Sequence, residues 1–183
     1  MPCGGIHCIR TAQSYEHRTV WNNLPKALSD ENCLEVRAEM SAAGLMAGIA
    51  YTDAQVNFGH FIIHALGARY HTPHGELCGV VLPYLAEFCT KYMSAEMAQI
   101  ARIIGIDPAA ENFGAEMAEK IRVFVRGTGL RSLAGCGIPK EEVLEMTEMM
   151  YGGFQSSRAT ASCMKQAPKA EFTHFIEKIA SDQ

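Results

Sequence analysis

The chain has 183 residues, of which 48% are hydrophobic and 20% are charged, and its mean hydropathy is -0.01. This composition excludes an intrinsically disordered chain, which is poor in apolar residues and rich in net charge. The formal net charge of -4 disfavours a nucleic-acid-binding protein, because such proteins normally carry a basic surplus.

The sequence contains no apolar run of about 18 residues, so no membrane span is predicted. Its seven cysteines are scattered and include no Cys-x-x-Cys pair, which is unlike a secreted disulfide scaffold. The N-terminal residues lack the basic-then-apolar order of a signal peptide. These features predict a reduced, cytoplasmic protein.

Apolar residues recur at the helical spacing of three and four along most of the chain, whereas the alternation typical of strands is weak. The predicted helices cover residues 20–28, 34–51, 56–66, 73–91, 94–104, 112–128, 140–151 and 171–180. Residues 29–32 are predicted to form a turn, Gly67 and Gly105 to end the helices before them, and residues 152–168 to be irregular.

Successive helices with short connections predict an all-α fold, a helical bundle. Residues 1–18 are expected to form an atypical N-terminal segment, and residues 19–183 one helical domain that binds metal and substrate.

Four of the seven histidines fall within residues 57–75. His60 and His64 are four residues apart, which places both on one face of a helix. A short loop after Gly67 leads to His74 in the first turn of the next helix, so His74 is expected to return close to His60. Imidazoles that converge from adjacent helices suit a divalent transition-metal ion. A histidine on a helix is also often an ordinary surface or core residue, and this alternative stays open.

The same stretch resembles the signature of the iron-containing (group III) alcohol dehydrogenase family. The helical C-terminal domain of that family carries Gly-x-x-His-x-x-x-His-x-Leu-Gly followed by Pro-His-Gly. The matching positions are His60, His64, Leu66, Gly67, Pro73, His74 and Gly75. Further similarity lies in residues 23–27, 47–51 and 82–83, and in Cys163 followed by Pro168-Lys169. Asn57 stands where the family usually has glycine.

The resemblance implies an oxidoreductase that interconverts alcohols and aldehydes or ketones with NAD or NADP and one divalent metal ion, Fe2+ or Zn2+. It implies that His60 and His74 are metal ligands. It also implies that His64 is a catalytic residue beside the nicotinamide, and no other residue of this chain is expected to contact that cofactor. Tyr51 and Cys163 are implied to line the substrate pocket.

The chain departs from the family pattern in its N-terminal part. It lacks the Asp-x-x-x-His motif that supplies the family's other two metal ligands, and it lacks an N-terminal nucleotide-binding domain with a glycine-rich turn. Two imidazoles alone are expected to bind a metal weakly. We therefore expect a truncated or split family member that acts on a small alcohol or aldehyde with a companion polypeptide carrying the nucleotide-binding domain.

The alternative is a non-catalytic helical module for oligomerisation or regulation. Under either hypothesis we expect a homo-oligomer, because loss of a cofactor domain would uncover an apolar face. Neither a nucleic acid nor a membrane is an expected partner.

Overall fold

The computed structural model describes the backbone of residues 3–54, 57–156 and 164–182, and the side chains of residues 14–52, 57–156 and 165–182. Within these ranges the regular secondary structure is entirely helical, which confirms the predicted all-α fold. The helices form two compact units, one spanning Met1–Val56 and Ala98–Ala110 and the other Asn57–Met97 and Glu111–Gln183. No helix in the described ranges is both long enough and apolar enough to cross a membrane.

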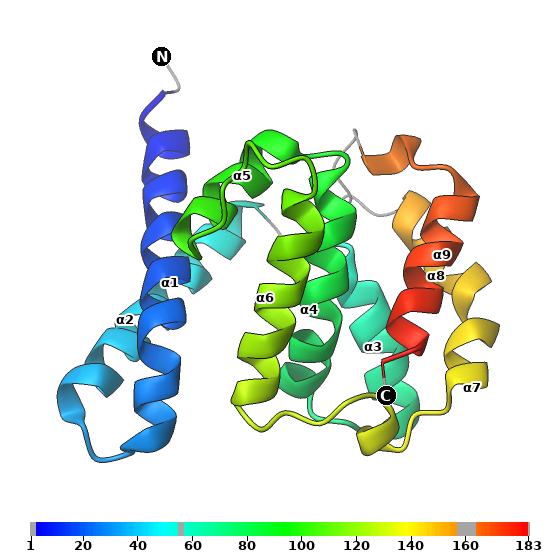
Figure 1. Ribbon diagram of the computed structural model, residues 1–183, viewed down its shortest axis with the longest axis horizontal. Helices are drawn as coiled ribbons and strands as arrows, with labels where there is room; N and C mark the ends of the chain where they lie inside the picture. Colours follow the sequence, from blue (N-terminus) through cyan, green and yellow to red (C-terminus); the bar gives the residue numbers. More distant parts are fainter. Residues whose placement is uncertain (1–2, 55–56, 157–163, 183) are drawn as a thin grey trace. The chain divides into compact units, whose positions relative to one another are not determined.

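The first unit is dominated by two long helices, α1 (Cys3–Ser29) and α2 (Leu34–Ala54), which lie side by side in opposite directions (Figure 1). The turn predicted between them is confirmed. However, α1 begins at Cys3 and not at residue 20, because neither glycine nor proline interrupts the chain between Ile6 and Leu24. Helix α1 therefore continues across the boundary predicted between residues 18 and 19.

A side-chain hydrogen bond joins these two helices. The Asn23 amide donates a hydrogen bond to the Glu39 carboxylate, and Asn23 is only 7% exposed. Ala43 on α2 is also buried, so a small side chain lies where the two helices meet. The small Ala43 side chain lets the helices approach closely, and the buried Asn23 amide is paired with the Glu39 carboxylate.

The next helix, α5 (Ser94–Ile103), ends close to the predicted glycine. Gly105 has a φ of 74°, a left-handed conformation that glycine adopts without a steric penalty.

The second unit contains six further α-helices among the described residues. They are α3 (Gly59–Tyr70), α4 (His74–Thr90), α6 (Phe113–Gly127), α7 (Lys140–Glu145), α8 (Thr147–Ser156) and α9 (Lys169–Ala180), with short 3-10 helices η1 (Ala134–Cys136) and η2 (Met164–Gln166). Helix α4 contacts α3, α6 and α9 and runs opposite to α3 and α6 (Figure 1). The connection from α3 to α4 is short, so the start of α4 lies near the end of α3.

Aromatic side chains form much of the core of this unit. The buried phenylalanines of the described residues are Phe58, Phe88, Phe154, Phe172 and Phe175. The centroids of Phe58 and Phe154 are 4.9 Å apart, and those of Phe88 and Phe175 are 4.7 Å apart. Because Phe58 immediately precedes α3, these contacts anchor the beginning of the histidine-bearing helix.

The predicted end of α3 at Gly67 is wrong, since the helix continues to Tyr70. The residue that closes it is His71, whose φ of 51° is left-handed and whose backbone N–H donates to the Gly67 carbonyl at 2.9 Å. A residue other than glycine therefore makes the left-handed C-terminal cap.

The helix predicted for residues 140–151 is two helices, α7 and α8, separated at Met146. Met146 is 9% exposed and Thr147 is 8% exposed, so the break is associated with two side chains that enter the core. Helix α8 continues to Ser156, which corrects the prediction that residues 152–156 are irregular. Residues 157–163 lie outside the described part of the chain.

Candidate metal centre

A compact loop before α3 determines where His60 lies. The Gly59 backbone N–H donates to Asn57 Oδ1 at 2.9 Å, and the His60 backbone N–H donates to the Asn57 carbonyl at 3.1 Å. A Cβ atom at position 59 would lie 2.8 Å from Asn57 Oδ1 and 3.1 Å from Leu85 Cδ2. Asn57 therefore closes the first turn of α3, and Gly59 allows this turn to approach α4.

The first turn of α4 carries His74 and is held by an ion pair. The Nε and Nη2 atoms of Arg131 donate to the two carboxylate oxygens of Glu76, each at 2.8 Å. These hydrogen bonds hold the pKa of Glu76 at about 2, well below its usual value. The Glu76 side chain is 11% exposed, so this pair fixes the beginning of α4 against the segment after α6.

The structure brings three imidazoles from α3 and α4 together. The ring centroids of His60 and His74 are 5.3 Å apart, those of His64 and His74 are 5.4 Å apart, and those of His60 and His64 are 5.7 Å apart. His60 is half-buried, whereas His64 and His74 are exposed. The predicted return of His74 to His60 is thus confirmed, while the roles of the three residues stay predictions.

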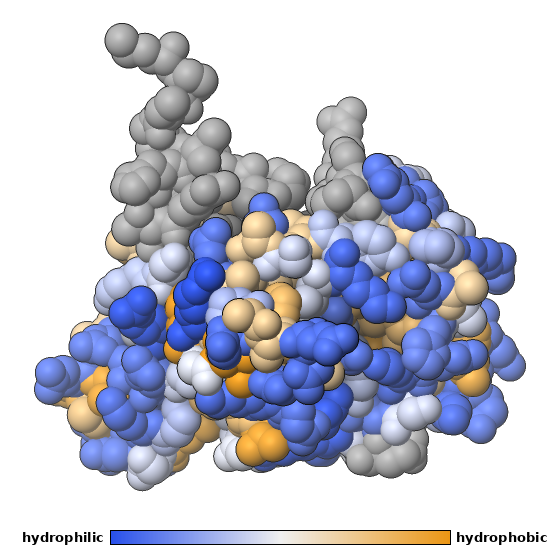
Figure 2. All heavy atoms as spheres, turned by 45° about the horizontal axis from the view of Figure 1, so that its top comes forward, coloured by the Kyte–Doolittle hydropathy of each residue, from blue (hydrophilic) through white to orange (hydrophobic). Residues whose placement is uncertain are grey.

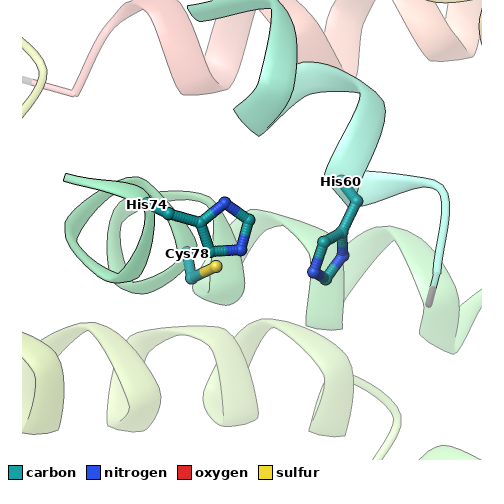
Figure 3. Close-up of side chains that lie close together, drawn as sticks. All are labelled: His60, His74 and Cys78. Atoms are coloured by element: carbon teal, nitrogen blue, oxygen red, sulfur yellow. The ribbon is translucent and has the colours of Figure 1, made fainter. Parts of the chain in front are cut away.

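A cysteine joins this group. One ligand atom each from His60, His74 and Cys78 can be chosen so that all three lie within 4.8 Å of one another. Figure 3 shows the His74 ring and the Cys78 sulfur, both on α4, beside the His60 ring from α3. Sequence analysis missed Cys78, although its spacing of four residues from His74 places both side chains on one helix face.

Local electrostatics favours the uncharged form of His60. Burial lowers its pKa, and the neighbouring His74 and His64 rings lower it further. The Nδ1 atom of His60 is buried and makes no well-formed hydrogen bond to the described residues, although the nearby Asn57 backbone partly offsets the lowering of the His60 pKa. An imidazole with an available lone pair and an unsatisfied buried nitrogen fits a cation ligand.

The two suggested substrate-pocket residues lie outside the part of the structure that forms this cluster. Tyr51 belongs to α2 in the first unit and is 59% exposed. Cys163 lies outside the described residues. Both assignments therefore stay predictions.

Comparison with known proteins identifies the family. Residues 14–179 match the C-terminal part of the Fe-containing alcohol dehydrogenase family. The long-chain-alcohol dehydrogenase 1 of Geobacillus thermodenitrificans is 28% identical over 138 residues, which are 72% of this chain and 34% of that protein. The 1,3-propanediol dehydrogenase of Klebsiella pneumoniae is 33% identical over 88 residues, or 48% of this chain and 23% of that protein.

Solved structures show the same fold. An alcohol dehydrogenase from Oenococcus oeni superposes with a TM-score of 0.79 at 21% identity, over 92% of this chain and 44% of that one. The chain thus spans less than half the length of the relatives it matches. Because the family match covers most of its residues, the chain belongs to the Fe-containing alcohol dehydrogenase family and corresponds to the C-terminal part of its members.

Proposed function

We propose that this chain is the metal- and substrate-binding half of an oxidoreductase that interconverts alcohols and aldehydes or ketones with NAD or NADP. The observation that carries the proposal is the convergence of His60, His64 and His74 from two antiparallel helices, with centroid separations of 5.3–5.7 Å. Family membership supports the reaction class.

His60 and His74 are the residues that would hold the divalent ion, Fe2+ or Zn2+. The lowered pKa of His60 favours a free lone pair on its ring at neutral pH, and a metal ligand must be deprotonated. When bound, the ion supplies Lewis-acid polarisation of the alcohol oxygen, which eases its deprotonation.

His64 is the residue that would move the proton. Its ring is exposed to solvent and lies 5.4 Å from that of His74, measured between centroids. Imidazole changes charge near neutral pH, so it can accept a proton from the alcohol and release it to water. His64 is thereby assigned the catalytic role, and His60 and His74 the ligand role.

The nicotinamide dinucleotide requires a binding domain, and the sequence shows no glycine-rich turn after a predicted strand that would mark one. One relative is a NADPH-dependent butanol dehydrogenase of Clostridium saccharobutylicum, of which this chain covers 39%. We propose that the nucleotide half lies outside the present sequence, in a companion polypeptide or in further residues of a longer chain. Cys33, Cys78 and Cys136 are free thiols, which supports a reducing compartment such as the cytoplasm.

Alcohol oxidation with NAD+ or NADP+ tests this function, measured with added Fe2+ or Zn2+ for this chain alone and mixed with the candidate companion. We expect activity only in the mixture and its loss in His64→Ala. The matched control is His71→Asn, because His71 is exposed on the same segment and asparagine tolerates its left-handed backbone.

Robust turnover by this chain alone would contradict the proposed division into two halves. Unchanged turnover in His64→Ala would contradict the proton-transfer role of His64.

The alternative function is that of an oligomerisation module, and it is supported by exposed apolar side chains on α2. Leu45, Ile49 and Tyr51 are 65%, 47% and 59% exposed. On the face drawn in Figure 2, apolar residues appear in small groups between hydrophilic ones. Sedimentation velocity of the wild type and of Leu45→Glu distinguishes the cases: a homo-oligomer that the substitution dissociates supports this role, and a wild-type monomer contradicts it.

A further inference from the structure

Cys78 lies one helical turn after His74, on the same face of α4. Its sulfur belongs to the group in which the ligand atoms of His60, His74 and Cys78 lie within 4.8 Å of one another (Figure 3). We propose that Cys78, as a thiolate, is a third protein ligand of the ion held by His60 and His74, and that this donor set selects zinc over iron(II) and magnesium. The inference rests on the proposed metal site and adds to it a ligand and a metal preference.

The observed spacing is close to that of a tetrahedral site. Zinc binds histidine nitrogen at about 2.1 Å and cysteine sulfur at about 2.3 Å, so donor atoms around it lie roughly 3.5 Å apart. The three donors lie within 4.8 Å of one another, so side-chain rotation has to bring them about 1 Å closer to bind one shared ion. Three ligands from this chain leave the remaining position open to an exogenous oxygen or to a ligand from the proposed other half of the enzyme.

The charge balance of the cluster also calls for the thiolate. His60 and His74 are neutral ligands and bring no negative charge to a divalent ion. Glu76 lies between His74 and Cys78 in sequence, but both of its oxygens accept hydrogen bonds from Arg131 at 2.8 Å. Among the described residues of the cluster, Cys78 is therefore the donor that can supply a negative charge.

Metal preference follows from donor chemistry. Thiolate and imidazole ligands favour zinc, whereas oxygen ligands suit magnesium and other hard cations. The buried Nδ1 of His60, which makes no well-formed hydrogen bond in the described ranges, is a nitrogen that a cation could satisfy.

Ligation replaces one bond of Cys78 by another. The S–H bond breaks, the sulfur lone pair forms the bond to the metal, and the proton passes to the buffer. The oxidation state of the metal does not change, so no oxidant or reductant takes part.

Cobalt(II) titration of the whole chain under reducing conditions tests the proposal, because a thiolate bound to cobalt(II) gives a charge-transfer band in the near ultraviolet. We expect this band in the wild type and in Cys33→Ser, and its absence in Cys78→Ser. Cys33 is a matched control because it is free, partly exposed and located in the other unit. Zinc affinity should fall at least about 100-fold in Cys78→Ser.

Calorimetry with zinc in two buffers of different ionisation enthalpy gives a second readout. The wild type should release about one more proton per ion than Cys78→Ser. Circular dichroism checks that each variant is folded, and Cys78→Ala replaces Cys78→Ser if the latter unfolds.

Two results would overturn the inference: no thiolate band in the wild type, or an unchanged band and zinc affinity in the cysteine variant. If His60→Ala then still abolishes binding, the two-histidine site of the proposed function stands while the cysteine ligand falls. If neither His60→Ala nor His74→Ala changes binding, both proposals fall.

Discussion

Phe58 shows how a single side chain supports the site without belonging to it. It is 1% exposed, and its ring contacts those of Phe88, Phe154 and Phe175 at centroid distances of 5.7, 4.9 and 5.9 Å. Phe58→Ala removes these contacts and leaves a cavity, so we expect it to lower the free energy of unfolding by about 3–5 kcal/mol. Urea denaturation measures this loss.

Phe61 is the matched control for that substitution, since it lies three residues later, in the first turn of α3, and is 38% exposed. Phe61→Ala should cost much less than Phe58→Ala. Equal losses for the two variants would contradict the assignment of Phe58 to the core.

Asp182 is a buried carboxylate, 6% exposed, that accepts hydrogen bonds from Tyr84 Oη at 2.9 Å and Arg126 Nη2 at 2.7 Å. Asp182→Asn removes the charge that Arg126 faces, and we expect a loss of about 2 kcal/mol in unfolding free energy. Thermal and urea denaturation measure it, with the exposed Asp107→Asn as control. A stability equal to that of the wild type would show that this pair contributes nothing.

At the scale of elements, Glu171 links the start of α9 to the end of α4. Its carboxylate accepts hydrogen bonds from Lys91 Nζ and Tyr92 Oη, each at 3.0 Å. The Lys91 and Tyr92 hydrogen bonds lower the pKa of Glu171. Burial and the adjacent carboxylate raise the pKa of Tyr92 to about 12.

These shifts predict the pH window in which the link stabilises the fold. A lowered carboxyl pKa contributes stability above the ordinary value of about 4.3, and the contribution is lost as pH falls. A raised phenol pKa contributes below about pH 10 and is lost as pH rises towards 12. We therefore expect Tyr92→Phe to lower the unfolding free energy by about 1 kcal/mol at pH 7, and by less at pH 3. Urea denaturation at both pH values measures this, and a difference that grows on acidification would contradict it.

Helix ends that are marked by turn-forming residues or by glycine were predictable from the sequence. The turn at residues 29–32 and the end of α5 before Gly105 are examples. The break at Met146 was not predictable, because it depends on burial of Met146 and Thr147 among residues distant in sequence. The left-handed cap at His71 was missed because glycine is the usual signal for that conformation.

The candidate site was predictable only where its residues are close together in the sequence. The spacing of His60 and His64 follows from one helix, and the short loop to His74 implied the return of the chain. Cys78 needed the antiparallel placement of α3 and α4, which places its sulfur near the His60 ring.

At the scale of the whole molecule, the central claim is that an ion is held between two successive helices of a chain that spans less than half of its relatives' length. Each histidine ligand is at least partly accessible to solvent, so its loss should remove the ion and leave the helices folded. Loss of the ion from a folded variant indicates a ligand role, whereas unfolding of the variant indicates a structural role.

Elemental analysis of the purified chain after incubation with Zn2+ or Fe2+ and removal of unbound metal tests this claim most directly. We predict about one ion per chain in the wild type and in His71→Asn, and little or none in His60→Ala and His74→Ala, with all four proteins showing the same helical circular dichroism. Equal metal content in all four proteins, or unfolding of both alanine variants, would contradict it.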